Sequence, residues 1–81
     1  MSNEISLTVE GNPGEDFQVW YRGDRETGEA PIVYTGKIGT DGSATVPVPR
    51  AYLVLGRPGR RDGVPLELHL ETGASKTVRL P

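Results

Sequence analysis

The residues best suited to acid–base or metal chemistry are Glu67, His69 and Glu71, which include the only histidine of the chain. Apolar and polar residues alternate from Val64 to Glu71, the pattern of a half-buried strand. On such a strand the three side chains share one face, about 7 Å apart in succession. Three ligands on one flat strand lack the enclosing geometry and supporting hydrogen bonds of a tight metal site. The pattern therefore predicts a solvated strand face and no bound metal.

Nucleophilic catalysis has little support in the chain. There is no cysteine, and a catalytic triad can be composed only from Ser43, His69 and Asp41. Nothing around Ser43 resembles a nucleophile elbow. We therefore predict that the protein is not an enzyme and has no cofactor.

Arg57, Arg60 and Arg61 lie in the glycine-flanked segment GRPGRRDG, residues 56–63. Mobile guanidinium groups and exposed amides suit a phosphate or a nucleic-acid backbone. A nucleic-acid partner is nevertheless not expected, because the pI is about 5.3 and no aromatic residue follows Tyr52. The three arginines are candidates for docking on an acidic protein surface, and the simpler interpretation is a loop kept soluble by its charge.

Trp20, the only tryptophan, is the fourth candidate binding residue. In the run FQVWYR, residues 17–22, Phe17 and Val19 fall on one face and Trp20 on the other. If Phe17 and Val19 face the core, Trp20 is an exposed anchor for a protein or a sugar ring. If the strand is covered on both faces, Trp20 belongs to the core, as in immunoglobulin-like domains. The sequence leaves both interpretations open.

Arg22, Gly23 and Asp24 spell the tripeptide that integrins bind. Chance accounts for a match of this length, and the first ten residues have neither the basic nor the apolar segment of a secretion signal. No apolar run approaches the roughly 20 residues of a membrane span. The expected location is the cytoplasm or a larger particle.

Short strands must position these residues. Apolar runs are separated by turns rich in Gly, Pro and Asp at intervals of roughly ten residues, and no window has a helical period. Pro47 and Pro49 mark an edge strand, and AYLVLG, the most continuously apolar run, is placed centrally. The predicted fold is one all-β domain over residues 1–81, an antiparallel sandwich or barrel of about seven strands. The runs cover residues 5–10, 17–22, 30–38, 44–49, 51–56, 64–71 and 75–81.

The segment TGKIGTDGSATVPVPRAYLVL, from Thr35 to Leu55, resembles a tract of prealbumin-like modules, the carboxypeptidase regulatory-like and PEGA-type domains. In these modules a strand, a Thr-Asp-Gly turn, an alternating strand, a proline-bearing bend and a Tyr-led strand follow one another. The resemblance covers about a quarter of the chain and implies a β-sandwich of the accessory or adhesion type without an active site.

Charge is distributed unevenly along the chain. Up to residue 49 there are three basic and eight acidic side chains, and from residue 50 on there are six basic and three acidic ones. Such asymmetry favours contacts between copies if the fold keeps the halves apart. We therefore expect a structural or assembly subunit that docks on itself or on a larger scaffold, as decoration or accessory proteins of phage particles do. The alternative is a carbohydrate- or ligand-binding module with Trp20, Tyr21, Tyr34 or Tyr52 as stacking platforms.

Overall fold

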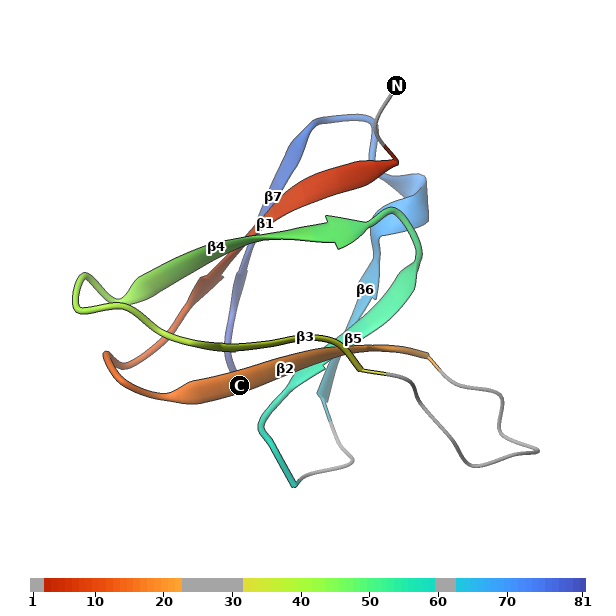
Figure 1. Cartoon of the computed structure of the whole chain (residues 1–81). Coiled ribbons are helices and arrows are strands. Elements are labelled where there is room, and N and C mark those ends of the chain that lie inside the picture. Colours follow the sequence, from red (N-terminus) through yellow and green to blue (C-terminus); the bar gives the residue numbers. More distant parts are fainter. Residues whose placement is uncertain (1–2, 23–31, 60–62) are drawn as a thin grey trace.

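The computed structural model describes residues 3–22, 32–59 and 63–81, and these residues form strands joined by short turns (Figure 1). A single-turn 3-10 helix, η1 (Leu68–Leu70), interrupts the described series of strands near its end. The strands are β1 (Glu4–Glu10), β2 (Asp16–Tyr21), β3 (Ile32–Lys37), β4 (Ser43–Pro49), β5 (Tyr52–Gly56), β6 (Gly63–Glu67) and β7 (Ser75–Arg79).

The strands form two separate sheets, which Figure 1 shows as two layers. Sheet A has the order β4-β1-β7, and sheet B has the order β3-β2-β5-β6. All neighbours are antiparallel except β1 and β7, which run parallel. The predicted all-β fold is confirmed, and the two layers make it a sandwich. β5 lies inside its sheet, and β4, which carries Pro47 and Pro49, lies at an edge, as the sequence predicted.

The core fills the space between the sheets with alternate residues of the strands. The alternation arises because successive side chains of a strand point to opposite faces. No polar or charged residue of the described chain is buried. Contacts between apolar side chains therefore stabilise this interior. The buried residues are Ile5, Leu7, Val9, Phe17, Val19, Ile38, Val46, Val48, Leu53, Leu55, Leu66, Leu68 and Leu80.

The turn between β3 and β4 takes the chain from sheet B to sheet A. The Ser43 amide donates to Oδ1 of Asp41 at 3.2 Å, and Gly42 has φ of 84°. An aspartate that binds its own following backbone and a glycine at positive φ are the residues that such a tight turn requires. The Thr-Asp-Gly turn is therefore a tight turn, but it joins strands of different sheets and does not form the hairpin that its sequence suggests.

The predicted strand over residues 64–71 is wrong in its second half. β6 ends at Glu67, and Leu68–Leu70 form η1. Glu67 is paired with Tyr52, the first residue of β5, so β6 has no strand partner beyond it. The Leu68 amide donates instead to the carbonyl of Ala51 at 3.2 Å. Leu68 is buried, but Leu70 is 65% exposed because the 3-10 turn breaks the alternation.

Candidate functional site

An apolar row crosses the outer face of sheet B. Because the core residues of β2 and β5 point inward, Trp20 and Val54 between them point outward. Trp20 lies opposite Val54 of β5, and Val54 lies opposite Pro65 of β6. On its other side Trp20 lies opposite Ile32 of β3, beyond a shift of register between Val19 and Trp20. Opposed residues of neighbouring strands share a face, with Cβ atoms about 4.5–5.5 Å apart. We call Ile32, Trp20, Val54 and Pro65 the apolar row.

The apolar row is partly open to solvent. Trp20 and Val54 are half-buried, Pro65 is exposed, and Ile32 is 58% exposed. Phe17 and Val19 on the same strand as Trp20 are fully buried in the core. Trp20 therefore points away from the core, and it is half-buried there and not fully exposed.

The outer face of sheet A has a different chemistry. Thr8 lies opposite Thr45 on one side and Thr77 on the other, and Ser6 lies opposite Ser75. The hydroxyl oxygens of Thr8 and Thr45 are 3.0 Å apart. Hydroxyl side chains of this kind form a solvated face, so the two outer faces of the sandwich are chemically distinct.

Tyr52 lies between two other side chains beside the apolar row. The Arg22 guanidinium carbon is 4.8 Å from the centre of the Tyr52 ring, and Arg22 Nη1 donates to the Tyr52 hydroxyl at 2.6 Å. The His69 ring is stacked with Tyr52, with 6.0 Å between centroids. These contacts are a cation–π interaction and an aromatic pair. They occupy the ring that a stacking ligand would need.

Tyr21 and Tyr34 do not belong to this outer face. Tyr21 lies opposite the buried Leu53, and Tyr34 lies opposite the buried Val19. Both therefore have the inward orientation at the margin of the core, where they are 41% and 37% exposed. The Tyr34 ring is stacked with the Phe17 ring at 6.4 Å. The four aromatic residues of the carbohydrate hypothesis are thus divided between the two faces of sheet B.

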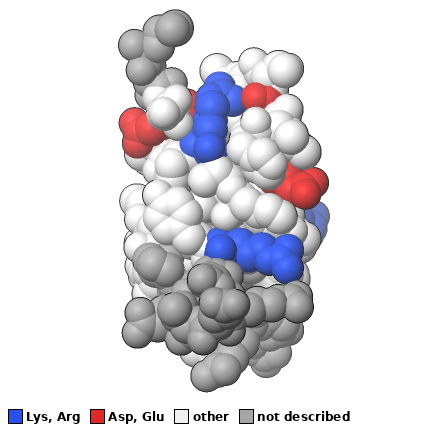
Figure 2. All heavy atoms as spheres, turned by 90° about the vertical axis from the view of Figure 1, so that its right-hand side faces the viewer, with Lys and Arg blue, Asp and Glu red and all other residues white. Residues whose placement is uncertain are grey.

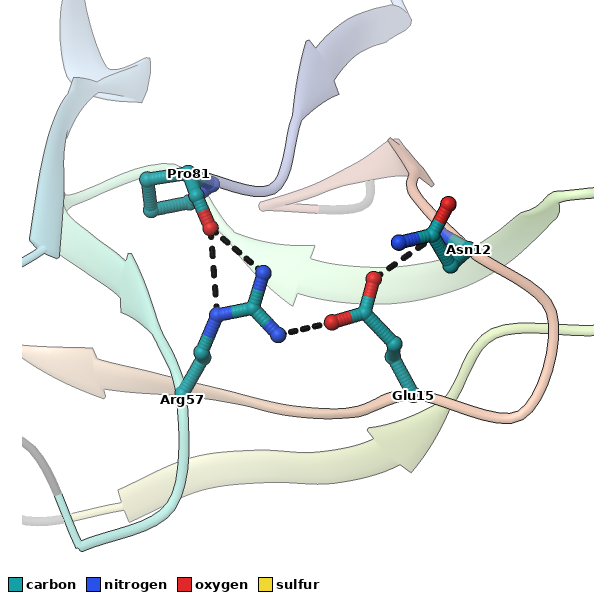
Figure 3. A network of polar contacts seen from close by, with 4 residues as sticks. All are labelled: Asn12, Glu15, Arg57 and Pro81. Atoms are coloured by element: carbon teal, nitrogen blue, oxygen red, sulfur yellow. Dashed lines mark hydrogen bonds and ion pairs between the residues drawn. The ribbon is translucent and has the colours of Figure 1, made fainter.

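Arg57 joins three segments of the fold (Figure 3). Its Nε and Nη2 donate to the carbonyl of Pro81 at 3.1 and 2.6 Å, and its Nη1 is paired with the Glu15 carboxylate. The other oxygen of Glu15 accepts a hydrogen bond from the backbone N–H of Asn12 at 2.9 Å. These contacts give Arg57 a role within the fold. Arg60 and Arg61, the other two predicted docking arginines, lie outside the described residues.

The Arg57 pair predicts a dependence of stability on pH. The hydrogen bond from Arg57, followed by that from the Asn12 amide, lowers the pKa of Glu15. The ionised carboxylate therefore contributes stability above the unfolded pKa of about 4.3, and this contribution disappears as pH falls through the lowered value. In acid titrations of unfolding free energy, Glu15→Gln should reduce the slope below about pH 4.3. Arg57→Gln should do the same, and an unchanged slope in both variants would contradict this role.

The residues that suggested catalytic or metal chemistry are not brought together as a site. Among the described residues no group of three or more His, Asp or Glu side chains has the arrangement of a metal site. The 3-10 turn places His69 against Tyr52, whereas Glu71 pairs with Lys76 at 2.9 Å. Ser43 Oγ donates to Asp41 Oδ2 at 3.2 Å within the β3–β4 turn. Gly23 and Asp24 of the integrin-type tripeptide lie outside the described residues.

A groove of about 460 Å³ lies beside β6, η1 and β7. It is mainly apolar, and the Lys76–Glu71 ion pair is part of its wall. The titratable residues in its lining are Tyr52, Glu67, Glu71 and Lys76, and Glu71 and Lys76 are paired with each other. Its lining residues are Tyr52, Val64, Pro65, Leu66, Glu67, Leu68, Leu70, Glu71, Lys76 and Val78.

Basic side chains form no continuous patch on the face that Figure 2 shows, where they stand apart in a mostly uncharged surface with acidic groups nearby. Across the described residues, several basic side chains contact their own chain. Arg50 donates to the carbonyls of Glu71 and Gly73 at 2.9 and 2.6 Å, and Lys37 is paired with Asp16 at 3.5 Å. On this face the described residues lack the electrostatic footprint of a nucleic-acid interface.

Comparisons with protein-family models, curated proteins and solved structures find no match to the chain. The resemblance of Thr35–Leu55 to prealbumin-like modules therefore stays a prediction. In the part of the chain that the structure describes, no helix is long and apolar enough to cross a membrane.

Proposed function

We propose that the protein is a non-catalytic assembly subunit of the decoration or accessory type, which docks on copies of itself or on a larger scaffold. The apolar row on the outer face of sheet B is the observation that carries this proposal. Scattered apolar residues are normal on a protein surface, but contiguous ones rimmed by polar groups mark interaction sites. Here Trp20, Val54 and Pro65 follow one another in register across three strands of one sheet, and Ile32 of the fourth strand is paired with Trp20 beyond a shift of register.

Trp20 has the properties of an interface anchor. Binding energy is concentrated in a few residues near the centre of an interface, and tryptophan is enriched among them. Trp20 lies within the apolar row, flanked by Ile32 and Val54, and it is half-buried before any partner arrives. A side chain already held by its neighbours loses little conformational freedom on binding, so more of its contact energy contributes to affinity.

Docking through charged side chains has less support than docking through the apolar row. Arg22, Arg50, Arg57 and Lys76 each contact a partner within the chain. A docking surface built on them would have to replace those contacts. Docking through the apolar row requires none of these contacts to break.

The carbohydrate-binding alternative has less support than docking. A sugar ring stacks on the open face of an aromatic ring, but the Tyr52 ring already contacts Arg22 and His69. Tyr21 and Tyr34 have the opposite orientation to Trp20 in sheet B. Of the described aromatic residues on this face, only Trp20 would then have a ring open to a sugar.

Trp20→Thr tests the proposal because threonine suits a strand and removes the anchor. Light scattering after size-exclusion chromatography should show a weaker association, by about tenfold or more for an anchor of this type. In the unmodified chain, the fluorescence of the single tryptophan should shift to shorter wavelength as concentration rises from micromolar to millimolar. The matched control is Tyr21→Thr, an aromatic neighbour on the same strand with the opposite orientation, which should leave association unchanged. A monomer with constant Trp20 emission would contradict self-docking.

A further inference from the structure

Three of the four edge strands that the described residues form carry features that oppose pairing with another strand. The Arg50 amide donates toward β1, so by alternation the positions of Pro47 and Pro49 face away from β1 at the free edge of β4. Proline has no N–H, which removes two donors from that edge. The Leu68 amide donates toward β5, and the same alternation places Pro65 at the free edge of β6. β4 and β6 are therefore poor templates for a further strand.

The β7 edge is protected by a charge that points inward. Lys76 lies opposite the buried Leu7, so its side chain starts from the core face of sheet A. It is half-buried and paired with Glu71 at 2.9 Å. An inward-pointing lysine at an edge strand is a known protection, because an added strand would have to bury the charge.

β3 has neither a proline nor an inward-pointing charge, and its one irregularity is the shift of register against β2 that leaves Val33 without a paired residue. The stretch from Tyr34 to Lys37 is paired regularly with β2. The one charge of β3, Lys37, is exposed. The Ile38 amide donates to the carbonyl of Glu15 on the β2 side. By alternation the backbone N–H and C=O groups of Thr35 and Lys37 point away from β2, to the free edge of the sheet. No strand of the described chain pairs with that side of β3.

We propose that β3 pairs antiparallel with β3 of a second copy of this chain. The inference rests on the proposed assembly function and names the partner for one of its contacts. A two-fold antiparallel pair uses the same edge of both copies, so one unprotected edge is sufficient. Because Pro65 disrupts the opposite edge of sheet B, pairing through β3 closes at two copies and does not extend into a filament.

One register fits the residues of β3 well. With Thr35 opposite Thr35 of the second copy, each threonine exchanges both of its outward backbone hydrogen bonds with the other. Tyr34 then lies opposite Gly36 of the second copy, so no two bulky side chains are directly opposed at these positions. Lys37 lies opposite Val33 of the second copy, so the two lysines are not directly opposed. The contact is small, and we expect the dimer to dissociate on dilution.

Thr35→Pro tests the edge directly, because it removes an outward N–H and leaves the hydrogen bonds to β2 in place. In sedimentation equilibrium it should raise the dissociation constant of the dimer by about tenfold or more. The matched control is Thr45→Pro. It changes the same residue type at a position of β4 where the backbone N–H also points to the free edge of its sheet, and it should leave dimerisation unchanged. Circular dichroism should show a folded β protein in both variants.

Hydrogen exchange in the unmodified chain provides a measurement that does not depend on a variant. The Thr35 and Lys37 amides should exchange more slowly as concentration rises, while the Thr45 amide should not change. A monomer at millimolar concentration, or exchange at Thr35 that is independent of concentration, would overturn the β3 proposal. If Trp20→Thr weakens association and Thr35→Pro does not, the assembly function stands and the β3 pairing is wrong. If Thr35→Pro weakens association and Trp20→Thr does not, the β3 pairing stands and self-docking through the apolar row is wrong.

Discussion

Leu53→Ala should lower the free energy of unfolding by about 2–5 kcal/mol, the usual loss when a buried leucine is truncated. Leu53 has no exposed surface. It lies on β5 opposite Leu66 of β6 and Tyr21 of β2, so strands on both sides hold the space that the side chain would leave. Single domains are stable by only about 5–15 kcal/mol, and this one truncation removes a large share of that. Urea unfolding followed by circular dichroism measures the loss.

Val54→Ala is the matched control, because Val54 is the next residue of the same strand and faces outward in the apolar row. Its truncation removes fewer buried atoms and leaves no internal cavity, so the loss should be clearly smaller than for Leu53. A loss below about 1 kcal/mol for Leu53→Ala would mean that β5 is not the centre of the core.

The alternation of apolar residues was sufficient to predict most of the fold. Ile5, Leu7 and Val9 alternate with polar residues, and all three are buried. Where the prediction was wrong, at residues 68–71, the alternation continues in the sequence but the pairing partner does not. Strand formation depends on a neighbour for the backbone hydrogen bonds, and a sequence pattern does not show where the neighbouring strand begins.

The candidate site could be predicted only in part. Trp20 was identified because it is unique in the chain and alternates with Phe17 and Val19. Ile32, Val54 and Pro65 were not, because each belongs to a different apolar run and only the register of four strands puts them beside Trp20. Arg57 was predicted to dock on a partner because its loop is basic, whereas its contacts in the structure come from segments distant in sequence, Glu15 and Pro81.

The two proposed contacts use different parts of sheet B and are compatible. Pairing through β3 would join two four-stranded sheets at their edges, and both outer faces would then lie on the same side of one larger sheet. Each copy would keep its own apolar row uncovered, because edge pairing uses backbone groups in the plane of the sheet. The dimer would present two copies of Trp20 to a scaffold, and linked sites increase the apparent affinity without any new contact.

The β5–β6 pair contains a close backbone approach that only glycine allows. Gly63 lies opposite Gly56 in the register of the two strands. A Cβ atom at Gly63 would lie 2.4 Å from the carbonyl oxygen of Leu55 and 2.8 Å from a methyl carbon of Val54. The first neighbour is backbone and is held in the sheet, so it cannot move aside as a side chain would. The start of β6 therefore has to shift if Gly63 gains even one methyl group.

Gly63→Ala should accordingly destabilise the domain by about 1–3 kcal/mol or more, the range for overpacking at a site that cannot relax. Alanine normally stabilises a chain relative to glycine by restricting the unfolded state, so a loss must come from the clash in the folded state. Gly73→Ala is the matched control: its Cβ would meet only the Ser75 carbonyl, at 3.9 Å, and its stability should stay within about 0.5 kcal/mol of the original. Thermal unfolding of both variants compares the two positions. Equal stability of Gly63→Ala and Gly73→Ala would show that β6 can move away from β5, and the pairing that places Pro65 in the apolar row would then lose its support.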